Sequence, residues 1–319
     1  MADLVILTEA GGSAGFGHLM RCLAIANETD AELYVNADGD YPDNNRSKKY
    51  NWRTNLDKLI SELPASCSIL VDSYLADSHI YKLLSTHFEY VSVIDDYNRL
   101  VYPVDIIINP GIKLPDYRNQ TAKVVGGNKY IILRKEIIQQ QKKSDYQKYS
   151  NLLITFGGCD TSNIFEWLLP LIHEYSFNSI TIVAGNNRIC SLLSKKFNRS
   201  SIKWLGQVDA LYMANLMYDA DICISAGGQT LHELAYIGVQ TICIETGEDQ
   251  KNNIEGYIDA GFLQGNLSIE TDGLNQRVSY FLNMYKNLEV RKGATLSGKS
   301  MVDGRGCMRI EEVIYNLAS

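Results

Sequence analysis

The sequence of 319 residues contains no uninterrupted apolar run near the length that a membrane helix needs. Such a helix takes about 20 consecutive apolar residues, and Asp3 and Glu9 interrupt or end the first apolar segment. No cationic stretch precedes that segment, so the first fifteen residues do not fit a secretory signal sequence. We therefore expect a cytoplasmic protein without an integral membrane segment.

Positive charge is also scarce. The chain has 30 Lys and Arg against 37 Asp and Glu, which gives a formal net charge of −7. This balance provides no positive electrostatic potential for binding nucleic acid, so we expect no nucleic-acid partner. If the protein binds phosphate, it must do so through local backbone geometry.

The sequence also lacks paired cysteines and a recognisable metal motif. It has seven cysteines, an odd number, with no C-x-x-C pair and no zinc-like spacing. This pattern favours reduced thiols in a cytoplasmic enzyme over a disulfide framework. The adjacent carboxylates Asp95 and Asp96 have no third carboxylate or histidine at ligand spacing, so we expect no metal and no other cofactor.

What the sequence does contain is a regular alternation of short β-branched runs with amphipathic helical segments, which is typical of parallel sheets flanked by helices. A chain of this length usually forms two domains. We predict an N-terminal domain (1–145), a C-terminal domain (146–302) and a C-terminal helix (303–319) that packs back on the first domain. The polar segment 139–150 is the expected linker, and the polar segment 37–52 is an expected surface loop. The predicted strands are 4–9, 32–37, 68–74, 90–96, 104–110, 130–136, 151–158, 179–185, 202–208, 221–228 and 240–246.

The stretch "TEAGGSAGFGHLMRCLAIA" combines a strand end, a glycine-rich turn and a helix start. It does not match G-x-G-x-x-G, because Met20 stands where the last glycine belongs. His18 falls in the first helical turn, where the helix dipole disfavours imidazolium, so a neutral His18 can accept a proton there. The alternative is a structural glycine turn followed by a solvated histidine.

The stretch "ISAGGQTLHELAYIGV" repeats this arrangement in the second half, with a helix that starts at Gln229 or Thr230. Thr230 and Glu233 fit a capping box. Alternatively, Glu233 binds the hydroxyls of a ribose while the amides of Gly227, Gly228 and Gln229 hold phosphate. "ITFGGCDTSN" is a third turn of this kind. At the ends of two predicted strands, Asp72, Tyr74, Asp95 and Asp96 either line a crevice or serve as caps and turn formers.

Several motifs occur in the order of one family: "GFGHLMRCLAIA", "LVDSY", "VIDD", "TFGGCDTSN", "ISAGGQTLHELAYIGV" and "DQKNN". Over nearly its whole length the chain resembles the UDP-sugar hydrolases of pseudaminic acid biosynthesis, which are related in fold to the GT-B glycosyltransferases. The resemblance implies a GT-B-like α/β fold of two Rossmann-like domains with parallel sheets and an interdomain cleft. It implies hydrolysis of a UDP-linked diacetamido-trideoxyhexose to UDP and free sugar, by attack of water at the anomeric carbon and without a metal. We expect a monomer.

The resemblance also implies roles for individual residues. His18 and Tyr74 would be catalytic. Residues on the sugar side would be Gly15, Gly17, Arg21, Asp72, Asp249, Gln250 and Asn253. Nucleotide-binding residues would be Gly157, Gly158, Gly227, Gly228, Gln229, Thr230 and Glu233. Family members usually have Asn-Gln where this chain has Asp249-Gln250, which leaves the sugar open. A glycosyltransferase that uses an acceptor hydroxyl instead of water is the alternative enzyme, and a nucleotide-sugar-binding protein without catalysis is a third interpretation.

Overall fold

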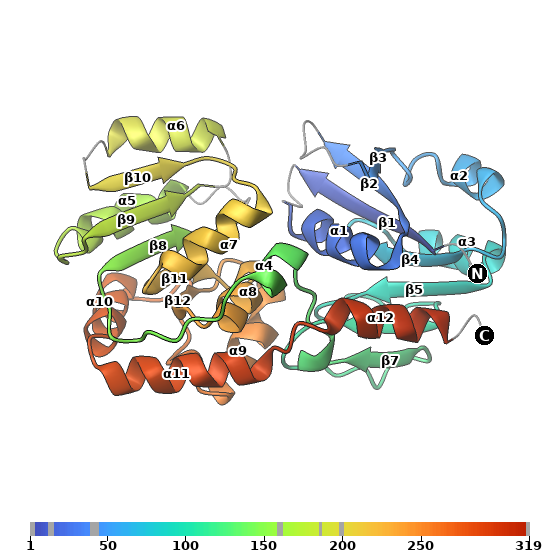
Figure 1. The fold of residues 1–319 in the computed structure, drawn as a ribbon. Coiled ribbons are helices and arrows are strands. Elements are labelled where there is room, and N and C mark those ends of the chain that lie inside the picture. The colour runs from blue at the N-terminus through green and yellow to red at the C-terminus, as the bar shows by residue number, and fades with distance from the viewer. Residues whose placement is uncertain are drawn as a thin grey trace. The chain divides into compact units, whose positions relative to one another are not determined.

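The computed structural model describes residues 4–11, 16–38, 45–157, 162–184, 187–197 and 201–316. The chain divides into two compact units, the first made of Met1–Arg134 with Gly304–Ser319 and the second of Lys135–Asp303. Each unit contains one parallel β-sheet with helices packed on it (Figure 1). The predicted fold class, two Rossmann-like α/β domains with parallel sheets, is confirmed.

The sheet of unit 1 has the strand order β3-β2-β1-β4-β5-β6-β7, and every pair of neighbours is parallel. Leu4 and Ile6 pack into a core with the helices α1 and α12, whereas Val5 and Leu7 pack into a second core with α2 and α3. Both faces are therefore covered, which explains the nearly continuous apolar runs of these strands. The strands are β1 (Leu4–Gly11), β2 (Glu32–Asp38), β3 (Ser47–Lys49), β4 (Ser68–Asp72), β5 (Tyr90–Ile94), β6 (Ile106–Asn109) and β7 (Lys123–Gly126).

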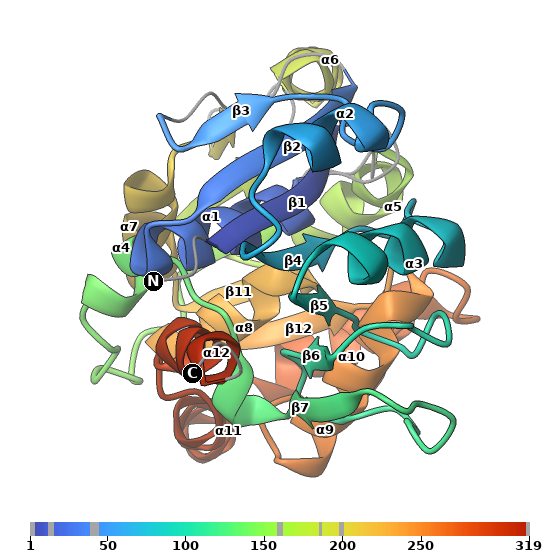
Figure 2. The ribbon, with the colours of Figure 1, turned by 90° about the vertical axis from the view of Figure 1, so that its right-hand side faces the viewer.

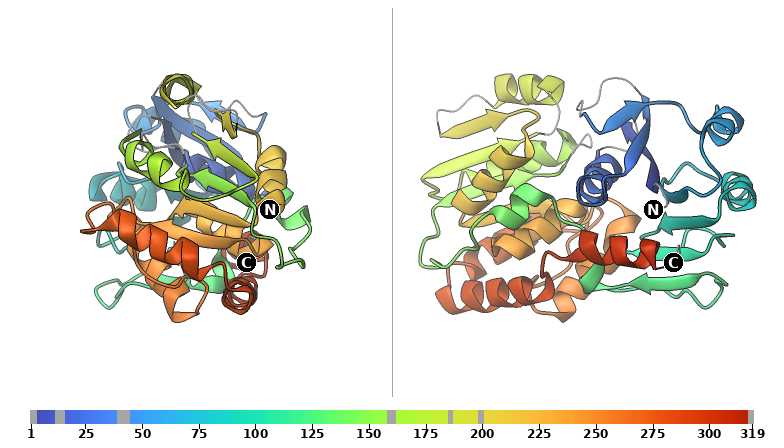
Figure 3. Two further views of the ribbon diagram at one scale, coloured as in Figure 1. Left: turned by 90° about the vertical axis from the view of Figure 1, so that its left-hand side faces the viewer. Right: turned by 45° about the vertical axis from the view of Figure 1, so that its right-hand side comes forward.

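The helices of unit 1 come from both ends of the chain (Figure 2). They are α1 (Gly17–Thr29), α2 (Leu56–Glu62), α3 (Ser78–His87), the short 3-10 helix η1 (Asn128–Tyr130) and α12 (Gly306–Tyr315). Cys307 and Ile310 of α12 share a core with Leu19 of α1. Both ends of the described chain therefore belong to unit 1 (Figure 3).

Two predictions for unit 1 are wrong. The segment 130–136 is not a strand, and the last strand of the sheet is β7, which was not predicted. Ile131, Ile132 and Leu133 are apolar because α12 covers them: a Cβ on Gly306 would lie 2.0 Å from the carbonyl oxygen of Ile131. Burial under a helix produces the same apolar run as burial in a sheet, so composition could not distinguish the two.

The polar segment 37–52 is not simply a surface loop. Residues 39–44 lie outside the described part, but β3 pairs with β2 further along the segment. Trp52 is fully buried, and its indole Nε1 donates a 2.7 Å hydrogen bond to the carbonyl oxygen of Thr8. The segment therefore adds an edge strand and a large core side chain to unit 1.

Trp52→Ala should destabilise unit 1 by about 3–5 kcal/mol, because it leaves a large cavity and removes the hydrogen bond to the Thr8 carbonyl. Urea unfolding monitored by circular dichroism measures the loss. Lys58→Ala on the exposed face of α2 is the control, with an expected change within about 0.5 kcal/mol. Equal stability of the two variants would show that Trp52 is not buried in the core of unit 1.

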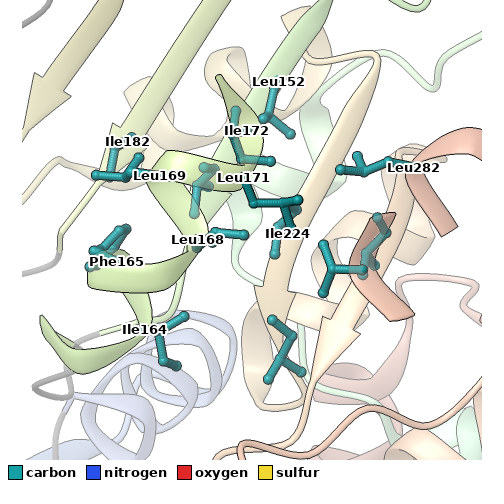
Figure 4. Packing of buried hydrophobic residues seen from close by; sticks show 14 of the residues in the cluster. Leu152, Ile164, Phe165, Leu168, Leu169, Leu171, Ile172, Ile182, Ile224 and Leu282 are labelled. Atoms are coloured by element: carbon teal, nitrogen blue, oxygen red, sulfur yellow. The ribbon is translucent and has the colours of Figure 1, made fainter. Parts of the chain in front are cut away.

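The sheet of unit 2 has the order β10-β9-β8-β11-β12 and is also entirely parallel. On one face, Leu152, Ile182 and Ile224 of the sheet pack against Phe165 and Leu168 of α5 and against Leu282 of α10 (Figure 4). The strands are β8 (Asn151–Thr155), β9 (Ser179–Val183), β10 (Ile202–Leu205), β11 (Ile222–Ala226) and β12 (Gln240–Ile244). The helices are α4 (Lys135–Gln139), α5 (Ser162–Ile172), α6 (Asn187–Lys196), α7 (Ala210–Asp219), α8 (Gln229–Ile237), η2 (Glu248–Gln250), α9 (Lys251–Asp259), α10 (Leu274–Met284) and α11 (Leu288–Met301).

The polar segment 139–150, predicted as the linker, belongs to unit 2. The backbone N–H of Lys143 donates to the carbonyl oxygen of Ile237 at 2.8 Å, and its ammonium lies 3.1 Å from the carboxylate of Asp221. Asp221 also accepts hydrogen bonds from the N–H groups of Ser150 and Asn151. The segment is polar because it packs through ion pairs and backbone bonds, and the units divide earlier, between Arg134 and Lys135.

No helix in the described ranges is long and apolar enough to span a membrane.

Candidate functional site

Four of the predicted site residues meet in unit 1, at the carboxyl ends of the neighbouring strands β1 and β4. His18 and Arg21 come from the first turns of α1, which begins at Gly17 directly after the glycine-rich segment. Asp72 is the last residue of β4, and Tyr74 follows it. The strand-to-helix order of this part of the chain therefore brings a helix start next to a strand end.

His18 is fixed by Asp72. The Nδ1 atom of His18 lies 2.7 Å from Oδ1 of Asp72, and the two residues are only 5% and 0% exposed. An ionised carboxylate only accepts hydrogen bonds, and Asp72 lies closer to Nδ1 than the Arg21 Nη2 donor at 3.2 Å, so we assign the proton to Nδ1. In a neutral ring Nε2 is then the unprotonated nitrogen, on the side that faces away from Asp72. A carboxylate that holds the tautomer in this way is the arrangement of a histidine general base.

Arg21 joins Asp72 to a second carboxylate, Asp96, which follows β5. The Arg21 Nε donates to Oδ2 of Asp72 at 2.6 Å, and Nη2 donates to Oδ1 at 2.7 Å. The Nη1 and Nη2 atoms also donate to the two oxygens of Asp96 at 2.9 and 2.8 Å. One guanidinium therefore holds two carboxylates in bidentate geometry.

Both carboxylates are ionised at neutral pH. Burial alone would raise the pKa of Asp72, but the charge of Arg21 and the hydrogen bonds from Arg21 and His18 hold it far below its usual range. Burial also opposes ionisation of Asp96, and the guanidinium of Arg21 lowers its pKa by charge and hydrogen bonding. Burial of the neighbouring Cys22 raises the pKa of its thiol, so Cys22 is neutral.

Tyr74 completes this cluster. Its hydroxyl donates a 2.5 Å hydrogen bond to Asp96, and its ring meets the His18 imidazole edge to face, with centroids 4.3 Å apart. The backbone N–H of Tyr74 donates to the carboxylate of Glu9 at 2.8 Å, and the Ser73 hydroxyl donates to the other Glu9 oxygen at 2.5 Å. Glu9 is 1% exposed at the end of β1, so it anchors the turn that carries Tyr74.

The positions of Arg21 and Asp72 differ from the expected ones. Both were predicted to contact the sugar, but they are 9% and 0% exposed and hold each other through paired hydrogen bonds. Asp96 was expected either to line a crevice or to serve as a cap or turn former, and its ion pair with Arg21 was not predicted. Its neighbour Asp95 is a turn former, because it accepts the N–H groups of Asn98 and Arg99. Within the described ranges, no group of three His, Cys, Asp or Glu is arranged to hold a metal.

Most of the other predicted site residues belong to unit 2, on the turns after β8 and β11 and on α8, η2 and α9. β8 and β11 are neighbours in the sheet, so the turns that follow them lie at the same edge. Gly157 follows β8 with a φ of +75°, a conformation that favours glycine. Helix α8 begins at Gln229 with Gly228 as N-cap and no side-chain cap bond, so the capping box of Thr230 and Glu233 is not formed. Gly15 and Gly158 lie outside the described residues.

The side chain of Gln250 is hydrogen-bonded to the turn between β11 and α8. Its Oε1 accepts hydrogen bonds from the N–H groups of Gly227 at 3.1 Å and Thr246 at 3.0 Å. The Gly227 N–H, which was expected to bind phosphate, is therefore used inside the protein, and Gln250 supports the turn. A Cβ on Gly227 would lie 2.6 Å from the Ile254 side chain, whereas a Cβ on Gly228 would meet nothing within 4 Å. Gly228 therefore borders open space at the start of α8.

Glu233 lies inside α8 and is 1% exposed, so its carboxylate is buried under the first turns of the helix. Asp249 belongs to η2, and Asn253 belongs to α9, which follows it directly. The first N–H groups of a helix have no partner inside the helix. The start of α8 thus combines N–H donors and a positive dipole end with open space at Gly228, which is suited to an anion.

Comparisons with known proteins agree with this fold. No family model matches the chain. It is 24% identical over 343 residues to the uncharacterized protein MJ1062 of Methanocaldococcus jannaschii, a match that covers 97% of this chain and 68% of that protein. It is 24% identical over 214 residues to the spore coat polysaccharide biosynthesis protein SpsG of Bacillus subtilis, covering 63% of this chain and 60% of SpsG.

Several solved structures match over nearly the whole chain. MurG of Acinetobacter baumannii has a TM-score of 0.65 at 14% identity, covering 98% of this chain and 99% of MurG. The UDP-GlcNAc 2-epimerase of Neisseria meningitidis bound to UDP-GlcNAc has a TM-score of 0.64 at 13% identity, covering 98% of this chain and 100% of the epimerase. At these identities the likeness shows the fold, which is GT-B-like.

Proposed function

We propose that this protein is a hydrolase of a UDP-linked sugar and releases UDP and the free sugar by attack of water at the anomeric carbon. The observation that carries the proposal is the buried pair of His18 and Asp72 at the carboxyl edge of the first sheet. Ligands of α/β sheets bind at this edge. The epimerase structure with its UDP-sugar supports a nucleotide sugar as the ligand class. The resemblance to the hydrolases of pseudaminic acid biosynthesis points to a diacetamido-trideoxyhexose.

The proposed reaction needs one proton acceptor. Nε2 of His18 takes a proton from water while the water oxygen forms a bond to the anomeric carbon. The bond between that carbon and the phosphate oxygen breaks, and UDP leaves with the electron pair. Asp72 holds the tautomer and offsets the positive charge that develops on His18. UDP is a good leaving group, so positioning water and accepting its proton are the main tasks of the site.

We assign the nucleotide to unit 2. The start of α8 at Gly228, Gln229 and Thr230, with Gly157 and Gly158 after β8, would face the diphosphate, because helix starts favour anions. Glu233 would hold the ribose hydroxyls only if nucleotide binding exposes its carboxylate, which is 1% exposed here. Asp249 and Asn253 would lie on the sugar side, while Gln250 would act by supporting the Gly227 turn. The protein would work as a monomer.

The test is incubation of purified protein with UDP-linked 2,4-diacetamido sugars and no acceptor, followed by NMR. Hydrolysis predicts that UDP and free sugar appear together in equal amounts. Release that requires an added acceptor would establish a glycosyltransferase, the alternative for a GT-B-like fold. A sugar that changes configuration while it stays linked to UDP would establish an epimerase. Either result would overturn the hydrolase proposal.

Gly228→Ala should weaken UDP binding by about tenfold or more. Its Cβ would stand in the open space where the diphosphate approaches α8, and loss of a glycine N-cap costs at most about 1 kcal/mol of stability. Isothermal titration calorimetry with UDP measures the change. Gly293→Ala is the matched control, because Gly293 is exposed on α11 and a Cβ there also meets nothing within 4 Å. Equal UDP affinity of the two variants would show that the nucleotide does not bind at this turn.

A further inference from the structure

Asp96 has no place in the proton transfer proposed above, yet it is tied to both residues that flank His18. Its two oxygens accept hydrogen bonds from Nη1 and Nη2 of Arg21, and Oδ2 also accepts the Tyr74 hydroxyl at 2.5 Å. The Asp96 side chain is 11% exposed and that of Arg21 is 10% exposed. A buried carboxylate with three hydrogen bonds from two site residues is costly unless its charge is used or compensated.

The charges of the cluster do not cancel while His18 is neutral. Arg21 contributes one positive charge, and Asp72 and Asp96 contribute one negative charge each. The cluster therefore carries a net charge of about −1 in the resting state, and it becomes neutral when His18 takes a proton. Without Asp96, Arg21 would already neutralise Asp72, and protonation of His18 would leave these three residues with a net positive charge.

We infer that Asp96 is a positioning residue that acts on His18 through Arg21 and Tyr74, and that its charge lets the buried cluster accept a proton at His18. Asp72 orients the ring directly, whereas Asp96 sets the charge of the cluster and fixes Arg21 and the Tyr74 hydroxyl. The inference rests on the proposed hydrolase function for its effect on turnover. Its effect on the protonation of His18 does not depend on that function.

The other charged and titratable groups around His18 are accounted for. On α1 they are Arg21 and the neutral Cys22, whose thiol lies 3.3 Å from Asp72. From β4 and the turn after it come Asp72 and Tyr74. From the end of β1 comes Glu9, which is held by Ser73 and by the backbone of Tyr74. Asp95 is occupied by the hydroxyls of Tyr102 and Tyr117 at 2.7 and 2.6 Å.

The test compares Asp96→Asn, Asp96→Glu and Tyr74→Phe in the full chain. The first readout is NMR titration of the histidine ring signals, with His18→Ala to assign the His18 signal. In Asp96→Asn we expect the His18 signal to titrate at a pH lower by about one unit, because its protonated form loses a compensating charge. Asp96→Glu keeps the charge and should restore most of the shift, and Tyr74→Phe should leave the midpoint within about 0.3 units.

The second readout is the pH dependence of UDP-sugar hydrolysis. In Asp96→Asn we expect kcat to fall about tenfold to a hundredfold with KM changed less than about threefold. The acidic limb of the profile should move to lower pH together with the NMR midpoint. An unmoved His18 titration in Asp96→Asn would overturn the inference, whatever the activity. If the His18 titration shifts in Asp96→Asn but the wild-type protein does not hydrolyse the UDP-sugar, the inference about Asp96 holds and the proposed hydrolase function is wrong.

Discussion

His18→Ala is expected to lower kcat for UDP-sugar hydrolysis by about 10²–10⁴-fold, because the substitution removes the only group that the proposed step uses to take a proton from water. KM should change little, since the imidazole is assigned to water and not to the nucleotide. UDP binding measured by calorimetry should also be retained. The fall should be the largest of any single substitution in unit 1.

His79→Ala is the matched control. His79 lies on the exposed face of α3, outside the cluster of His18, Arg21 and Asp72. We expect its kcat to stay within about twofold of the wild-type value, because surface substitutions away from such clusters have small effects. Near-normal turnover by His18→Ala would show that the general-base assignment is wrong even if the protein hydrolyses the substrate.

Asp72→Asn should be nearly as damaging, with kcat lower by about 10²–10⁴-fold. The amide group of Asn cannot accept hydrogen bonds at both positions that the Asp72 oxygens now occupy, because one of them becomes an N–H donor that faces Arg21 or His18. When that N–H stands at the Oδ1 position, the ring of His18 loses the partner that fixes the proton on Nδ1, and the wrong tautomer presents a proton at Nε2. Measurement of kcat and KM over the pH range tests this expectation.

Asp72→Asn also breaks one of the two ion pairs of Arg21, so its stability must be measured beside its activity. Removal of one partner from a buried pair can cost about 3–5 kcal/mol, but Arg21 keeps both hydrogen bonds to Asp96. We therefore expect a folded protein with a lower midpoint in urea. Asp116→Asn, which removes an exposed carboxylate paired with Arg118, is the control with unchanged activity. A folded Asp72→Asn variant with wild-type turnover would mean that Asp72 does not orient the base.

Much of the fold follows from the sequence because the strands of a parallel sheet are buried on both faces. The runs around Ile6, Val71 and Ile224 therefore stand out as apolar segments of strand length. The same signal led to a wrong strand prediction at residues 131–133, which are buried under the C-terminal helix α12. It was absent at β3, whose Ser-Lys-Lys sequence is that of an exposed edge strand. Edge strands and helix-covered segments depend on tertiary packing that composition does not encode.

Only part of the candidate site could likewise be predicted from the sequence. His18 stood out because a helix starts directly after a glycine-rich turn, and Tyr74 because it lies at the end of a predicted strand, whereas their catalytic roles came from the family resemblance. The partnership of Arg21 with Asp72 and Asp96 was not predictable, because it joins residues that are 51 and 75 positions apart in the sequence. Gln250 was expected at the sugar, yet it holds the Gly227 turn, since only the fold shows which amide reaches which loop.

In the proposed reaction this protein directs water to the anomeric carbon. Hydrolysis in H₂¹⁸O, with mass spectrometry of the released UDP, distinguishes this attack from attack at phosphorus. Attack at the anomeric carbon breaks the bond between carbon and oxygen, so UDP keeps its own oxygen and should contain no ¹⁸O from the solvent. A UDP with ¹⁸O in its terminal phosphate would show attack at phosphorus and would contradict the account, as would release of UDP only in the presence of an acceptor.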